Sequence, residues 1–106
     1  MTFGMTFTPI ASLADLTGEL SRHEVAGQTV ALARVGEHLY AFGDECTHLH
    51  CSLAEGELDG NAVVCPCHAS EFDVRSGAVL QGPAVEPTPA YPVRVVDGVV
   101  EVALGG

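Results

Sequence analysis

Short apolar runs alternate with turn residues along most of the chain. Residues 28–35 (QTVALARV) are apolar and β-branched, and residues 38–43 (HLYAFG) continue the pattern after Gly36 and Glu37. Two such runs joined by a short turn are typical of a β-hairpin. We therefore expect a hairpin over this part of the chain.

The second half of the chain carries similar signals. Asp97-Gly98 is the strongest short hairpin turn in the sequence, and it separates YPVRVV from VVEVAL. Three further short strands are expected at residues 61–65, 71–74 and 78–82.

Helical periodicity is nearly absent, and only residues 12–20 (SLADLTGEL) are expected to form one or two helical turns. Many short strands at this spacing predict an all-β fold, a small antiparallel sandwich or barrel. A chain of 106 residues is long enough for one buried core, so we expect a single domain over residues 1–106.

The charge of the chain is strongly one-sided. Fourteen acidic residues face four arginines and no lysine, which gives a formal net charge of −10. Nucleic acids and anionic membrane surfaces require clustered Lys or Arg, so neither is an expected partner. Such a charge serves either solubility or steered docking onto a basic protein. With no signal peptide and no long apolar run, we expect a cytoplasmic protein without a membrane anchor.

All four cysteines and three of the five histidines lie within residues 46–68. They form two mixed pairs, Cys46-x-His48 in CTHLHC and Cys65-x-x-His68 in CPCH. Cysteine and histidine are the side chains that hold transition metals. Each pair follows or closes an expected strand, so two ligand loops are expected to meet at one tip of the domain.

Other metal and thiol chemistries fit this spacing less well. Zinc fingers usually pair two cysteines and then two histidines, and c-type haem attachment needs C-x-x-C-H. Cys/His nucleophilic catalysis would leave the duplicated pair unexplained. His23 and His38 stand outside both stretches, and we interpret them as ordinary solvated or satisfied side chains.

The two pairs resemble the signature of Rieske proteins, in which two cysteines and two histidines hold a [2Fe–2S] cluster. The similarity runs from Cys46 through Phe72, and extends to GPAVEP, which resembles the proline loop of the family, and to YPVRVVDGVVEV, which resembles its final hairpin. The resemblance implies a Rieske-like fold in which a cluster-binding subdomain, at about residues 44–83, is inserted in a base β domain.

By this resemblance, the cofactor is one Rieske-type [2Fe–2S] cluster. Cys46 and Cys65 would bind the inner iron as thiolates, and His48 and His68 the outer iron as neutral imidazoles. Replacing two thiolates by neutral imidazoles removes negative charge and raises the reduction potential.

Further positions of the family pattern imply a disulfide and potential tuning. Cys51 and Cys67 match the positions that form a loop-joining disulfide in respiratory Rieske proteins. Ser70 matches a hydroxyl donor to the cluster, whereas Phe72 stands where respiratory members have a tyrosine, which lowers the expected potential. Ala69 differs from the glycine or glutamine that is usual at its position, and His50 stands where many members have glycine; His50 lies outside both ligand pairs.

The resemblance implies a one-electron carrier of an aromatic-ring dioxygenase system, rather than an enzyme in its own right. It would accept electrons from a flavin- and NAD(P)H-dependent reductase and pass them to a terminal oxygenase. Acidic residues near the tip, Asp44, Glu45 and Glu71, are expected to steer docking. The alternatives are a small Rieske subunit of nitrite reductase or another oxidoreductase complex and, from a different class, a zinc-stabilised interaction module.

Overall fold

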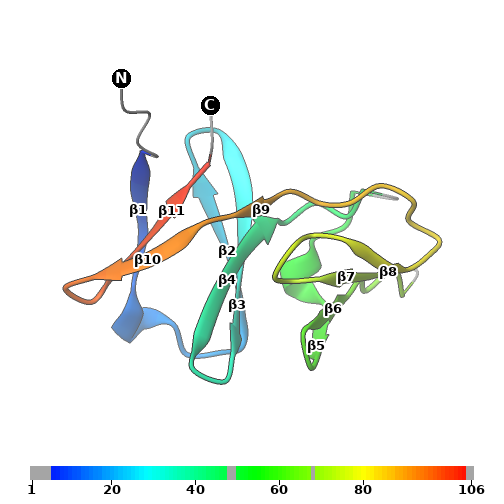
Figure 1. The fold of residues 1–106 in the computed structure, drawn as a ribbon, viewed down its shortest axis with the longest axis horizontal. Coiled ribbons are helices and arrows are strands. Elements are labelled where there is room, and N and C mark those ends of the chain that lie inside the picture. The colour runs from blue at the N-terminus through cyan, green and yellow to red at the C-terminus, as the bar shows by residue number, and fades with distance from the viewer. Residues whose placement is uncertain (1–5, 48–49, 68, 105–106) are drawn as a thin grey trace.

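The computed structural model describes residues 6–47, 50–67 and 69–104, and the regular elements of these residues are almost all antiparallel strands (Figure 1). The first sheet has the strand order β1-β11-β10 and the second has the order β2-β3-β4-β9. The strands of these two sheets are β1 (Phe7–Ser12), β2 (Leu20–Val25), β3 (Gln28–Val35), β4 (His38–Gly43), β9 (Ala90–Tyr91), β10 (Val93–Val96) and β11 (Val99–Ala103).

The third sheet lies to one side of the other two (Figure 1). Its strand order is β5-β6-β7-β8, with β5 (Glu57–Asp59), β6 (Ala62–Val64), β7 (Glu71–Asp73) and β8 (Val79–Gln81). Two 3₁₀ turns, η1 (Leu13–Asp15) and η2 (Leu53–Glu55), complete the described elements. The prediction of a small all-β antiparallel fold is confirmed. Among the described residues, no helix has the length and apolar character that are needed to cross a membrane.

The two hairpins expected from the sequence are both present. β3 pairs with β4, and Val35 lies opposite His38 across the turn. β10 pairs with β11 around Asp97 and Gly98, whose φ values are 49° and 78°. Two successive positive φ values match the twist of a two-residue hairpin, which explains why Asp-Gly was an informative signal.

The sequence pattern did not reveal β1, β2 or β5. β1 contains Pro9 and has a register shift between Pro9 and Ala11, which is tolerated because β1 is an edge strand. β2 is joined to β3 by Ala26 and Gly27, with φ values of 50° and 79°, although alanine is not a typical residue for such a turn. Of the expected helical stretch, only η1 is helical.

β3 separates two hydrophobic cores because successive strand residues point to opposite faces. Val30 and Leu32 are buried in a core shared with Val100 and Val102 of β11. The intervening alanines of β3 belong to a second core, which contains both cysteines of the predicted ligand set; its buried members are Ala31, Ala33, Phe42, Cys46, Leu53, Val63, Cys65, Phe72, Val74 and Ala84. The predicted metal site is therefore built on the second core.

Candidate metal centre

Two loops carry the cysteines, and their described backbones follow the same hydrogen-bond pattern. In the first loop (residues 44–52), the Cys46 N–H donates to the Cys51 carbonyl and the Cys46 carbonyl accepts from the His50 N–H, both at 2.8 Å. In the second loop (residues 65–70), the Cys65 N–H donates to the Ser70 carbonyl at 2.8 Å, and the Cys65 carbonyl accepts from the Ala69 N–H at 3.1 Å. Each loop thus holds its cysteine by the same two backbone bonds.

The residue four positions after each cysteine has a left-handed backbone. His50 has a φ of 61° and Ala69 a φ of 59°. Glycine adopts this region without a steric cost, whereas a residue with a Cβ atom does not. The two positions at which the sequence differs from the usual residues of the Rieske pattern are therefore positions that favour glycine.

Cys46 and Cys65 are buried residues of these loops. They are 1 % and 2 % exposed, and both pack in the core that contains Phe72. Neither cysteine belongs to the disulfide. The other two predicted ligands, His48 and His68, lie outside the described residues.

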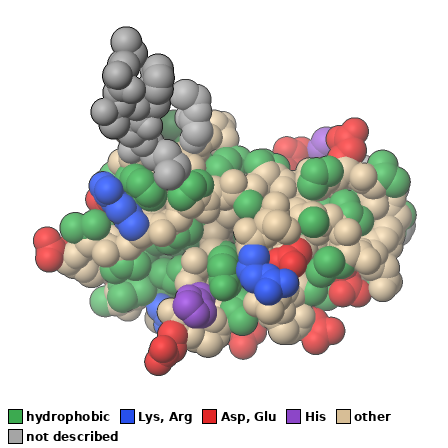
Figure 2. Space-filling view, in the orientation of Figure 1, with side chains coloured by type: hydrophobic (Ala, Val, Ile, Leu, Met, Phe, Trp, Pro, Cys, Tyr) green, Lys and Arg blue, Asp and Glu red, His purple; other side chains and the backbone are tan. Residues whose placement is uncertain are grey.

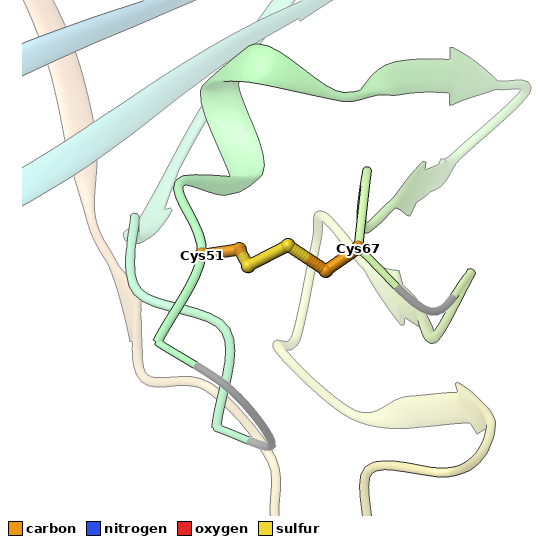
Figure 3. The surroundings of a disulfide bond; sticks show 2 residues. All are labelled: Cys51 and Cys67. Carbon is orange, nitrogen blue, oxygen red and sulfur yellow. A yellow bond between two sulfur atoms is a disulfide. The ribbon is translucent and has the colours of Figure 1, made fainter.

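A disulfide joins Cys51 in the first loop to Cys67 in the second, with 6.5 Å between the Cα atoms (Figure 3). It is the pairing that the Rieske resemblance implies. The sulfur atoms of Cys51, Cys65 and Cys67 all lie within 4.8 Å of one another. The two loops therefore meet at one place, as expected, and one predicted ligand sulfur lies beside the disulfide.

The connection between β8 and β9, which we call the third loop (residues 82–89), is bound to both cysteine loops. The Ala84 N–H donates to Ser70 Oγ at 3.0 Å, and the Thr47 hydroxyl donates to the Glu86 carbonyl at 2.7 Å. Ser70 is fully buried, and its oxygen already accepts a bond, so its own proton is available to a second acceptor. A buried hydroxyl of this kind can serve as a donor to a metal cluster.

Asp44 does not have the expected surface role. It is only 2 % exposed, its carboxylate accepts the Ala54 N–H at 2.9 Å, and it forms an ion pair with Arg22 Nε at 3.5 Å. The steering interpretation is wrong for this residue because its charge supports the first loop from inside. A local sequence pattern could not reveal this, since Arg22 lies on β2, far from the cysteine motifs.

The two other acidic residues expected to steer docking are more accessible. Glu45 is exposed and its carboxylate contacts His50 Nδ1, and Glu71 is half-buried on β7. Figure 2 shows acidic side chains spread over the visible face, including the end formed by β5–β8. The described surface near the loops is therefore still negatively charged, although Asp44 is buried.

Two further titratable groups have structural partners. A hydrogen bond from the Arg75 side chain lowers the pKa of Asp73, and the two side chains form a bidentate pair with N–O distances of 3.0 and 2.8 Å. His23 hydrogen-bonds to the Ser21 hydroxyl at 2.8 Å, and its pKa is lowered by burial. Both groups lie on strands or turns, and neither belongs to the cysteine loops.

Comparison with known proteins decides the family. The Rieske [2Fe-2S] domain matches residues 6–92. The chain belongs to the Rieske [2Fe–2S] family. This Rieske protein is 40 % identical over 98 residues to the anthranilate 1,2-dioxygenase ferredoxin subunit of Burkholderia cepacia, covering 92 % of this chain and 91 % of the relative. It is also 40 % identical over 93 residues to the biphenyl dioxygenase ferredoxin subunit of Pseudomonas sp. strain KKS102, covering 86 % and 85 %.

Solved structures agree with this assignment. The ferredoxin of carbazole 1,9a-dioxygenase from Nocardioides aromaticivorans IC177 superposes with a TM-score of 0.87 and 34 % identity, covering 92 % of this chain and 97 % of that one. A ferredoxin chain solved in a complex with the oxygenase of carbazole 1,9a-dioxygenase gives a TM-score of 0.83 and 36 % identity, covering 91 % and 100 %. This Rieske protein is thus an electron carrier of the ferredoxin type, with a [2Fe–2S] cluster as its cofactor.

The described residues fit that cofactor. Two buried thiols at equivalent positions of two loops are suited to be sulfur ligands, and Ser70 adds a buried hydroxyl within the second loop. An iron–sulfur cluster binds thiolates and is tuned by hydrogen bonds to its sulfurs, so both features suit it.

Proposed function

We propose that this Rieske ferredoxin carries single electrons from a flavin- and NAD(P)H-dependent reductase to a terminal ring-hydroxylating oxygenase. The observation that carries the proposal is the likeness, over most of both chains, to ferredoxin subunits of aromatic dioxygenases. A structural neighbour that was solved with its oxygenase supports the choice of acceptor. Because NAD(P)H is the expected source of electrons, we also propose that the protein works in the cytoplasm.

We propose that Cys46, His48, Cys65 and His68 hold the cluster, with the two cysteines on one iron and the two histidines on the other. When bound, a Rieske cluster supplies reversible one-electron chemistry. The buried position of Cys46 and Cys65 keeps water from their thiolates, and the Cys51–Cys67 disulfide limits the separation of the two loops. Ser70 would donate its hydroxyl proton towards the cluster and stabilise the added negative charge.

Reconstitution tests this function. The purified protein would be mixed with the reductase and oxygenase components of the anthranilate, biphenyl and carbazole dioxygenase systems, and hydroxylated product would be measured with the native ferredoxin omitted. We expect product from at least one oxygenase only when this protein is present. A protein that is reduced but supports no turnover with any of the three would contradict the proposal.

A further inference from the structure

The third loop exposes one apolar side chain beside the cysteine loops. Val85 is 88 % exposed, whereas the next most exposed large hydrophobic side chain in the described residues, Leu80, is 55 % exposed. Single apolar residues are common on protein surfaces, so exposure alone carries no functional meaning. Val85 differs from such residues in how the backbone on either side of it is held.

The residues on either side of Val85 are each bound to a different cysteine loop. Ala84 is 3 % exposed and donates its N–H to Ser70 of the second loop. The Glu86 carbonyl accepts the hydroxyl proton of Thr47 in the first loop. The backbone is thus fixed immediately before and after Val85. A side chain presented in this way loses little loop freedom when it becomes buried against a partner.

The surroundings of Val85 indicate what kind of partner surface fits. Glu86 is its exposed neighbour in the chain, and the exposed Glu45 lies two residues before Thr47, which contacts the third loop. The chain as a whole has a net charge of −10. An apolar anchor with an acidic rim complements an apolar recess that is bordered by Lys or Arg.

We propose that Val85 is the apolar anchor through which this ferredoxin binds its terminal oxygenase, in an apolar recess with a basic border. The inference rests on the proposed function, because it takes the oxygenase as the partner. A partner bound at the third loop would be near both cysteine loops, since Ala84 and Glu86 are bonded to them.

The dissociation constant for the oxygenase tests the anchor. The oxygenase that turns over fastest in the reconstitution serves as the probe, and its affinity is measured for wild type, Val85→Ser and Val95→Ser. Val95 is a matched control, because it is 45 % exposed but lies on β10 of the first sheet. We expect Val85→Ser to bind about tenfold more weakly, as loss of a buried valine predicts, and Val95→Ser to bind as wild type.

The reduction potential and the EPR signal of each variant should stay as in wild type, which separates docking from damage to the metal centre. We expect Thr47→Val, which lacks the bond to Glu86, to bind about threefold more weakly because the loop must be ordered on binding. Wild-type affinity in this variant would contradict the role of that bond.

Wild-type affinity in Val85→Ser would overturn the anchor while leaving the electron-carrier function intact. Weaker binding to the reductase alone would overturn the choice of the oxygenase as partner. If the wild-type protein bound none of the three oxygenases, both the anchor and the proposed function would be contradicted.

Discussion

The first and second loops share a backbone pattern, but different interactions attach them to the rest of the protein. In both, the cysteine carbonyl accepts a bond from the residue four positions later, which has a left-handed backbone. Beneath the first loop lies the buried carboxylate of Asp44, paired with Arg22 on β2. The second loop is bonded through the neutral hydroxyl of Ser70 to the third loop. The backbone thus fixes the position of each cysteine, while a buried charge supports the first loop alone among the described parts of the two loops.

This difference predicts that stability and reduction potential can be changed separately. Removal of the disulfide or of the Asp44 carboxylate should lower the stability of the protein, whereas changes around Ser70 and Phe72 should alter the reduction potential.

Removal of the disulfide should lower the free energy of unfolding the most, because this bond joins the first loop to the second. The bond closes a loop with a sequence separation of 16, for which chain entropy predicts a stabilisation of about 3 kcal/mol. We expect the double variant Cys51→Ser, Cys67→Ser to lose about that much free energy of unfolding in urea. Reduced wild type should match it. A thiol count on the denatured, unreduced and cluster-free wild type should give two reactive thiols, and a count of four would contradict the disulfide.

Replacement of Phe72 should change the potential and not the docking. A tyrosine hydroxyl at this fully buried position would add a donor in the core that contains Cys46 and Cys65. A charge-assisted bond of about 1.5–3 kcal/mol corresponds to an increase of roughly 60–130 mV for one electron. Voltammetry on Phe72→Tyr measures the change, with Phe7→Tyr on β1 as the control. An unchanged or lower potential in Phe72→Tyr would show that this position does not reach the cluster.

Loss of the buried carboxylate should weaken the first loop. Asp44→Ala leaves the Ala54 N–H without its side-chain acceptor, which predicts a loss of about 1–3 kcal/mol in the free energy of unfolding. Glu45→Ala removes only an exposed contact with His50, so its effect on the free energy of unfolding should be below about 1 kcal/mol. Chemical denaturation of the two variants measures the difference. Equal losses would contradict the distinction between a supporting and a surface acid.

The smallest change in stability should come from substitutions at the two loop residues with a left-handed backbone. Ala69→Gly removes the steric cost of a positive φ, so we expect a gain of about 0.5–1 kcal/mol. The gain in His50→Gly should be smaller, because this change also removes the side-chain contact with Glu45. Ala14→Gly in η1 is the control and should be destabilising. A loss of stability in Ala69→Gly would show that its backbone is not under steric cost.

Much of the fold follows from local sequence because β-branched strands and positive-φ turns leave a short-range pattern. The hairpins β3–β4 and β10–β11 were predictable for this reason. β2 was not, since it contains charged and polar residues and is joined to β3 by Ala26-Gly27. The loop cysteines were identifiable from spacing, but the burial of Asp44 depends on Arg22 and Ala54, which only the folded chain brings together.

The ligand set is tested most directly by the EPR spectrum of the reduced protein. We expect the wild type to show a Rieske-type signal, and His48→Ala, His68→Ala, Cys46→Ser and Cys65→Ser each to lose it. His50→Ala, a change in the same loop at a residue whose side chain pairs with Glu45, should keep it. An unchanged signal in any of the four ligand variants, or its loss in His50→Ala, would contradict the assignment of Cys46, His48, Cys65 and His68 as the residues that hold the cluster.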